Sequence, residues 1–450
     1  MTIIADFPFF PLSFDNDGKL TDATQLAALQ KQIESDALTD VVFISHGFRN
    51  SEADATNLYT QFLTNLRAHL ASAEFTSLAP RKFGVAGVMW PSKSFKEASD
   101  SVEGHAQSIG DTSSGRDEAM AAMKDARDTM ATPAQKQKLD KAIGMLDQLE
   151  ANPAIHDEFV KLVLSLTDGV KLEPSEGLDQ LRAKDGADVL EILKAPVILP
   201  TTSDDGDGGG VASFAPAAPV DDDGSTQGLG SFFGSVFGAV GTLMNVTTWY
   251  VMKNRSGVVG ANGVAEAVRS IKALPNAPRV HLVGHSLGGR LMASCSKTLA
   301  SPPLLQPDSL TLLEAAFSHY GFSAKGPSNP EGFFRAVVAN KVVKGPIVAT
   351  YSSKDIVVGL TYAVASRLAN DNTKAVGDAN DQFGGIGRNG VQNCDVGVLD
   401  TLHASDVPYA DIPLGKVVCF DGSAGLINNH SDITNPAVTY LFASALTRTS

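Results

Sequence analysis

The chain contains a serine set between two glycines, where a strand pattern passes directly into a helix pattern. This residue is Ser286, in the segment GHSLG at 284–288, which links the apolar run 279–284 to a helix expected from Leu287 to about residue 300. The glycines permit a turn tight enough to hold the serine hydroxyl above a sheet. The helix that follows offers free N–H groups and a positive dipole to a developing oxyanion. The pattern predicts a nucleophile for acyl transfer; the alternative is a glycine-rich turn without chemistry.

A serine hydroxyl becomes a good nucleophile only when a base accepts its proton and an acid orients that base. Among nine histidines, His430 lies between the apolar run at 416–420 and a closing helix pattern. Asp355 follows the apolar run PIVATYS at 346–352, where an aspartate is otherwise commonly a helix cap or a turn former. The rival candidates are His319 and His403 for the base, and Asp371, Asp378, Asp381 and Asp395 for the acid.

An earlier His46-Gly47 pair, also at the end of an apolar run, extends this set of motifs. GHSLGG after a strand, the stretch TDVVFISHGFRNSEADATNLY and the later VMWPS resemble the α/β-hydrolase superfamily. The likeness is strongest to its lipase- and esterase-like branches and to a little-characterised bacterial group within it. It covers about residues 5–92 and 245–448, and the middle third carries no such resemblance. It implies an eight-stranded, mostly parallel sheet, with an edge strand lost or altered in some members.

The resemblance also implies a role for each residue. Ser286 would be the nucleophile, His430 the base in the late loop, and Asp355 the acid, in the chain order that this fold uses. The backbone N–H groups of Phe48 and Leu287 would form the oxyanion hole, where losing one donor typically costs roughly 10²–10³ in rate. The two other histidines near these motifs, His46 and His285, are expected to border the substrate pocket. His46 would also shape its loop, and the ring of His285 is expected to point away from the nucleophile.

The elements around these motifs alternate between strands and helices. Short apolar runs predict strands at 40–45, 82–90, 279–284, 346–352 and 416–420, and helical spacing predicts helices at 51–73, 287–300 and 436–446. Strands separated by helices imply parallel βαβ units and a sheet covered on both faces. The functional groups of such sheets gather at the carboxyl ends of the strands, where the three candidate residues lie.

The charge of the chain is concentrated in one segment. The net charge is −14, and residues 92–230 carry −13 of it. We expect residues 1–91 and 231–450 to form one discontinuous catalytic domain with the α/β-hydrolase fold. Residues 92–230 are expected to form an acidic helical cap, because this insertion leaves the sheet at the carboxyl end of a strand and should stand over the active site.

The insertion contains two segments of different composition. Residues 113–166 show consecutive helix patterns, one of which starts at Pro133 with Thr132 and Gln135 as a capping box. Residues 201–228 are rich in Gly, Asp and Pro and are typical of a flexible linker.

An uncharged stretch, residues 225–252, ends the insertion and contains Gly230, Gly234 and Gly238 at spacing four. Small residues at this spacing permit close helix contacts. The favoured interpretation is a buried or pocket-lining helix, and the alternatives are a lid at a membrane surface or a membrane span. The aromatic candidates for an apolar acyl pocket are Phe232, Phe233, Phe237 and Trp249.

Composition argues against several other classes of function. The acidic balance disfavours nucleic-acid binding, and three cysteines fit neither a disulfide scaffold nor a zinc site. The Asp clusters at 204–207 and 221–223 lack the ligand spacing of a calcium loop. We therefore expect no metal and no cofactor. The first twenty residues make a poor signal peptide, so the cytoplasm is the expected compartment, with secretion by a non-standard route left open.

The sequence thus predicts a serine hydrolase that cleaves small-molecule carboxylic esters with an apolar acyl or alcohol part through an acyl-enzyme intermediate. Thioesterases and amidases use the same groups, and the sequence does not separate them. A rival from another class is a non-catalytic protein with this fold whose acidic insertion binds a protein partner. A further rival is a membrane-damaging phospholipase, which rests on residues 225–252 alone. The oligomeric state is left undetermined.

Overall fold

A mostly parallel sheet forms the centre of the molecule. The computed structural model describes residues 2–92, 112–195, 197–198, 211–212, 235–326, 331–369, 378–409 and 411–449. The strands of the sheet are β1 (Thr2–Ile4), β2 (Phe7–Ser13), β3 (Asp40–Ser45), β4 (Phe83–Met89), β7 (Arg279–His285), β8 (Ser309–Leu313), β9 (Ile347–Tyr351), β10 (Gly397–Thr401) and β11 (Val417–Asp421). Their order is β1-β2-β4-β3-β7-β8-β9-β11-β10, and every neighbouring pair is parallel except β1 with β2. The predicted α/β class with a mostly parallel sheet is confirmed.

The sheet has nine strands where eight were expected. β10 pairs with β11 at the outer edge, in a segment for which no strand was predicted. Its sequence GVLDT is partly or fully exposed, so it lacks the apolar run by which a buried strand is recognised. A separate antiparallel pair joins β5 (Val197–Ile198) to β6 (Val211–Ala212), and β6 falls within the expected linker. The rest of the range 201–228 lies outside the described residues.

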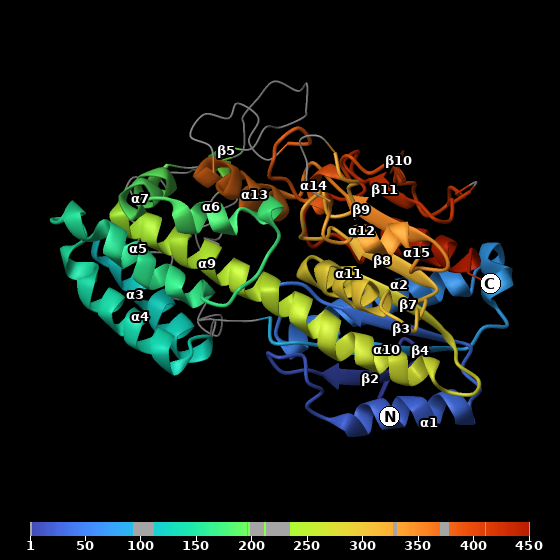
Figure 1. Cartoon of the computed structure of the whole chain (residues 1–450). Coiled ribbons are helices and arrows are strands. Elements are labelled where there is room, and N and C mark those ends of the chain that lie inside the picture. Colours follow the sequence, from blue (N-terminus) through green and yellow to red (C-terminus); the bar gives the residue numbers. More distant parts are fainter. Residues whose placement is uncertain are drawn as a thin grey trace.

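Helices cover both faces of the sheet (Figure 1). The described α-helices of the whole chain, including those of the insertion beside the sheet, are α1 (Ala23–Ser35), α2 (Glu52–Leu70), α3 (Thr112–Thr129), α4 (Pro133–Met145), α5 (His156–Leu164), α6 (Leu178–Ala183), α7 (Gly186–Lys194), α9 (Val236–Val258), α10 (Ala265–Lys272), α11 (Leu287–Leu299), α12 (Arg335–Ala339), α13 (Ile356–Ala369), α14 (Ile386–Asn389) and α15 (Pro436–Thr447). The buried side chains of α1, α10 and α11 join one apolar cluster, which includes Leu29 and Leu291. Those of α2 and α15 join a second, which includes Phe62 and Leu441. The three helices predicted in this part of the chain are observed as α2, α11 and α15.

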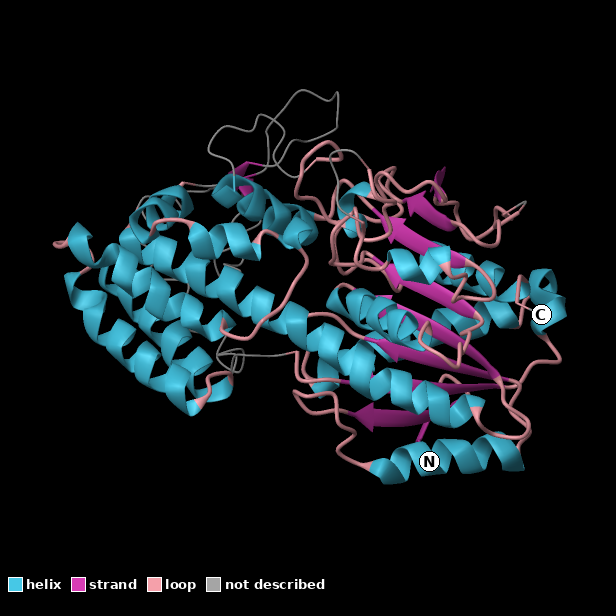
Figure 2. Ribbon diagram, viewed as in Figure 1, coloured by secondary structure: helices cyan, strands magenta, loops and turns pink. Residues whose placement is uncertain are grey.

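The carboxyl ends of the parallel strands face the helical insertion. In Figure 2 the strand arrows of the sheet point toward the insertion helices. The loops that follow β3, β7, β8, β9 and β11 therefore meet at the edge of the sheet beside the insertion. The loops that carry the predicted site residues therefore all lie at the carboxyl ends of the parallel strands.

Apart from the short pair β5–β6, the described part of the insertion consists of helices and their connections. Its helix α4 begins at Pro133, and its cap is reciprocal: the N–H of Gln135 donates to the Thr132 hydroxyl, and the N–H of Thr132 donates to the Gln135 side chain. The apolar faces of the insertion helices, with Leu139 and Phe159 among them, belong to the same buried cluster as α11. The insertion and the sheet therefore share one continuous hydrophobic core on this face.

Residues 236–252 of the uncharged stretch lie in the buried helix α9, and residues 225–234 lie outside the described structure. One end of α9 packs among α3, α5 and α7, and the other packs against α11 (Figure 1). The helix continues through a π-helical turn, Val259–Val264, into α10. Among the described helices, none combines the length and apolar character that a membrane crossing requires.

Candidate active site

Ser286 occupies a sharp turn between the end of β7 and the start of α11. Its backbone has φ 57° and ψ −124°, a conformation that L-residues rarely adopt. Three backbone hydrogen bonds hold this turn: the N–H of Ser286 donates to the carbonyl of Leu313, and the carbonyl of Ser286 accepts from the N–H groups of Ala316 and Gly289, each at 3.0 Å. Non-glycine residues in such conformations persist only where surrounding contacts enforce them, and they cluster at functional sites.

The glycines on either side of Ser286 are required by close backbone contacts. A Cβ on Gly284 would lie 2.2 Å from the carbonyl oxygen of Gly288. A Cβ on Gly288 would in turn lie 2.4 Å from the carbonyl oxygen of His46, in the loop after β3. Both positions therefore exclude any side chain. The turn and the His46 loop pack backbone against backbone as a result.

His430 and Asp355 are joined by a hydrogen bond. His430 Nδ1 lies 2.8 Å from Asp355 Oδ2, although 75 residues separate them in the chain. Asp355 follows β9 and is completely buried, and its other oxygen accepts the N–H of Val358 at 2.9 Å. The carboxylate thus starts the helix α13 and orients the imidazole, so the cap role and the orienting role coexist. Within the described structure Ser286 makes no hydrogen bond to His430; in structures without substrate such bonds are often long and tighten on binding.

The loop after β3 lies directly against Ser286. A Cβ on Gly47 would lie 2.6 Å from Ser286 Cβ and 3.2 Å from its Oγ. The next residue is Phe48, and Leu287 is the first residue of α11. Among the described residues neither of these backbone N–H groups donates a hydrogen bond, which for Leu287 is usual at the N-terminus of a helix. Both donors therefore flank the serine.

His46 holds this loop in place from inside the protein. Its N–H donates to the hydroxyl of Tyr59 at 2.9 Å, and its carbonyl accepts from the indole N–H of Trp90 at 3.0 Å. Its ring stacks on Trp90, with the ring centroids 5.6 Å apart. Burial lowers the pKa of His46 to about 4, so the ring is neutral at pH 7. These contacts show that His46 positions the loop after β3. Its ring is buried and does not line an exposed surface.

No protein family, curated protein or solved structure matches this chain. The chemistry of the site must therefore be argued from its own geometry.

His285 contacts His430 rather than lying apart from the site. The ring nitrogen Nε2 of His285 lies 2.8 Å from the carbonyl oxygen of His430, and the two ring centroids are 4.7 Å apart. The ring is buried, and its Nδ1 has no hydrogen-bond partner in the described structure. The ring is expected from the sequence to point away from Ser286, and the structure places it against His430. His285 is the last residue of β7, and the loop that carries His430 lies against it.

Glu314 is a buried carboxyl beside Asp355 that the sequence did not single out. It follows β8, is fully buried, and has a left-handed backbone with φ 43°. Burial, and then the charge of Asp355, raise the pKa of Glu314 well above its usual value. The signal available in the sequence is the run SLTLLE, in which an acid ends an apolar strand. A single acid of this kind is too common to identify a site.

The rival candidates have other neighbours. His403 stacks on Tyr409 with centroids 4.6 Å apart, and His319 is buried against the carbonyl of Asp381. The rival acids in the described structure are engaged in turns or pairs: Asp381 accepts from Ser366 and Phe383, Asp378 accepts from Asn380, and Asp395 pairs with Arg335. Asp371 lies outside the described residues. The contacts therefore favour Asp355 and His430.

A second Ser-His-Asp arrangement lies near the amino ends of the central strands, at the end of the sheet opposite Ser286. His281 Nδ1 is 2.9 Å from Ser309 Oγ, and its Nε2 is 2.9 Å from Asp40 Oδ1. All three residues are completely buried, and Arg81 also pairs with Asp40. Substrate has no access to these atoms. The same three residue types here serve as a structural clasp between β3, β7 and β8.

Buried charged and polar groups connect the insertion to helices α9 and α13. Glu176 accepts a hydrogen bond from the Tyr362 hydroxyl at 2.7 Å and from the N–H of Ser318 at 3.0 Å, and it pairs with Lys253 of α9. Tyr362 belongs to α13, the helix that begins directly after Asp355. The insertion is therefore fastened to the helix that follows the proposed acid.

The aromatic pocket candidates divide into two groups. Phe232 and Phe233 lie outside the described residues. Phe237 and Trp249 are buried in α9, and Trp249 packs edge-on against Tyr362 with ring centroids 5.8 Å apart. The structure thus places Trp249 in the packed junction between insertion and sheet.

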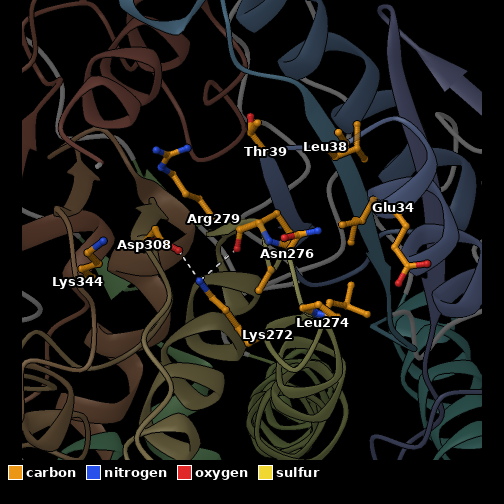
Figure 3. A pocket seen from close by; sticks show the side chains of 14 residues that line it. Glu34, Leu38, Thr39, Lys272, Leu274, Asn276, Arg279, Asp308 and Lys344 are labelled. Carbon is orange, nitrogen blue, oxygen red and sulfur yellow. Dashed lines mark hydrogen bonds and ion pairs between the residues drawn. The ribbon is translucent and has the colours of Figure 1, made fainter.

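A pocket of about 830 Å³ lies at the amino edge of the sheet (Figure 3). Thr39, which precedes β3, and Arg279, which begins β7, line it together with Lys272, which pairs with Asp308 at 2.7 Å. Ser286 follows the other end of β7, roughly 20 Å away along the strand. This pocket therefore does not serve the serine. Among the described residues, no cluster of His, Cys, Asp or Glu is arranged to hold a metal ion.

Proposed function

We propose that this protein is a serine hydrolase with the α/β-hydrolase fold, and that it cleaves carboxylic esters. The observation that carries the proposal is the hydrogen bond between His430 and Asp355 at the edge of the sheet where Ser286 occupies its strained turn. The mostly parallel sheet, the turn between β7 and α11, and the neighbouring loop with Phe48 support this fold assignment.

The proposed reaction uses one proton relay twice. Ser286 Oγ attacks the acyl carbon while His430 Nε2 accepts its proton, and Asp355 holds the opposite ring nitrogen as an N–H. The resulting oxyanion accepts hydrogen bonds from the N–H groups of Phe48 and Leu287. His430 then returns the proton to the leaving alkoxide, which departs as the alcohol and leaves an ester on Ser286. Water attacks this acyl-enzyme through the same relay and releases the acid.

An apolar substrate is supported by the side chains next to the acid. Ile356 and Val357 directly follow Asp355, and they are 49% and 52% exposed. They begin α13, beside the proposed catalytic acid. An apolar acyl or alcohol group that covers them would be favoured by roughly 25 cal/mol for each Å² removed from water.

The nucleophile assignment is tested with a fluorophosphonate probe. The wild type and Ser309→Ala should be labelled, while Ser286→Ala should not, because Ser309 belongs to the buried clasp and is closed to the probe. Equal labelling of the Ser286→Ala variant would overturn the nucleophile, and an unlabelled wild type would count against the enzyme as a whole. A panel of nitrophenyl esters of increasing chain length, acyl thioesters and anilides, each with the Ser286→Ala control, then distinguishes esterase from thioesterase and amidase activity.

A further inference from the structure

His285 is tied to the backbone of the residue proposed as the catalytic base. Its Nε2 lies 2.8 Å from the carbonyl oxygen of His430. A carbonyl oxygen only accepts hydrogen bonds, so Nε2 carries the proton and Nδ1 is the acceptor nitrogen. Burial lowers the pKa of His285 to about 3, so the ring is neutral. The donor that faces His430 is therefore present throughout the pH range in which a serine hydrolase works.

The other ring nitrogen of His285 gives no competing anchor. Nδ1 is buried without a hydrogen-bond partner in the described structure, and it lies 3.2 Å from the place where a Cβ on Gly47 would stand. An unpaired buried nitrogen costs free energy. A ring held in this position is thus held by its bond to His430 and by its packing against the His430 ring, with centroids 4.7 Å apart.

The base is consequently held at two points. Asp355 orients its ring through Nδ1, and His285 orients its backbone through the carbonyl. The residue that makes the second contact is the direct chain neighbour of Ser286. Because β7 is a buried central strand, its last residue is a rigid reference for the loop that carries the base.

We propose that His285 is a positioning residue that sets the place of His430 relative to Ser286; the proposal rests on the function proposed above. His285 contacts neither the acyl carbon nor the leaving group. Its removal displaces the base rather than the substrate, so it lowers kcat and leaves KM nearly unchanged. A displacement of about 1 Å at a catalytic group costs up to roughly 100-fold in rate.

A matched pair of substitutions tests this role. Glutamine places its amide N–H near the position of Nε2, whereas asparagine carries the same amide one methylene short of it. We expect His285→Gln to keep most of the wild-type kcat and His285→Asn to lose about 10- to 100-fold, with KM in both variants within about threefold of the wild type. Equal kcat in the two variants, or a loss confined to KM, would overturn the proposal.

Hydrogen–deuterium exchange of the intact proteins separates this proposal from the proposed function. Amide exchange in the segment 426–433 should be faster in His285→Asn than in the wild type and close to the wild-type rate in His285→Gln, whether or not any ester is hydrolysed. Unchanged exchange in His285→Asn would refute the tether even in an active enzyme. Faster exchange in that variant, with no labelling of wild-type Ser286, would support the contact between His285 and His430 and refute the proposed esterase activity.

Discussion

Arg290 of α11 and Glu173 of the insertion form a two-point ion pair, with nitrogen–oxygen distances of 2.7 and 3.1 Å. Arg290 lies one helical turn after Ser286, and both charged side chains are at least nine-tenths buried. The insertion is therefore fastened to the helix that carries the proposed nucleophile. A buried pair of this kind stabilises the fold only while both partners are present, because an unpaired buried charge is costly.

Replacing Arg290 alone should destabilise the protein strongly. We expect Arg290→Met to lower the free energy of unfolding by about 3–5 kcal/mol, since Glu173 is left buried without its partner. The double variant with Glu173→Leu should recover part of this loss. Urea unfolding measures both, and Arg127→Met serves as the control, because the solvent-exposed pair of Arg127 with Asp140 contributes little to stability. Similar losses in the single and double variants would argue against a coupled pair.

Substituting Gly47 should damage the site more than the fold. A Cβ there meets Ser286 Cβ at 2.6 Å, so Gly47→Ala pushes the Phe48 loop away from the serine. We expect the rate of fluorophosphonate labelling to fall by about 10²-fold, the typical cost of a lost oxyanion donor. The matched control is Gly144→Ala in α4, where a Cβ meets nothing within 4 Å and should add about 0.5–1 kcal/mol of stability. Labelling of both variants at the wild-type rate would contradict the proposed oxyanion loop.

The backbone of Ser286 should store measurable strain. At φ 57° a residue with a Cβ is disfavoured, and glycine is not. Ser286→Gly is therefore expected to be more stable than Ser286→Ala by about 1 kcal/mol, after allowing for the greater entropy of glycine in the unfolded chain. Both variants lack the hydroxyl, so their thermal unfolding isolates the backbone term. A more stable alanine variant would show that the turn is relaxed.

Stability should fall in mildly acidic solution. Burial lowers the pKa of His46 to about 4 and the pKa of His319 to about 3, whereas unfolding returns each to about 6.5. The unfolded chain thus binds more protons below pH 6.5, so this part of the stability is complete above that pH and is lost as the pH falls toward 4. We expect a loss of about 1–2 kcal/mol for each of these histidines at pH 5. Urea midpoints that coincide at pH 7.5 and pH 5 would contradict this loss of stability. The His319→Gln variant should take up one proton fewer on unfolding, so its free energy of unfolding should change less steeply with pH.

Local patterns made part of the site predictable. The GHSLG segment and its flanking residues predict a strand, a turn and a helix. All three are observed around Ser286. The strand before Asp355 and the helix after His430 are equally local signals. The assignment of roles to these two residues came from resemblance, and the bond between them at 2.8 Å is a matter of three-dimensional packing.

Other parts of the site have no local signature. The contact between His285 and His430 joins residues 145 positions apart, and no periodicity encodes it. Glu314 depends on burial beside a carboxylate from the next strand, which only the sheet order reveals. β10 is exposed at the sheet edge and carries no apolar run. Contacts across the sheet, rather than along the chain, account for what the sequence did not predict.

Helix α9 connects the insertion to the loop beside Ser286. Its 23 residues form a rod about 35 Å long, with one end among the insertion helices and the other against α11. Between these ends Asn245 accepts a hydrogen bond from Arg49 at 2.7 Å, in the loop that presents Phe48. One continuous helix therefore contacts both the insertion helices and the loop that carries Phe48.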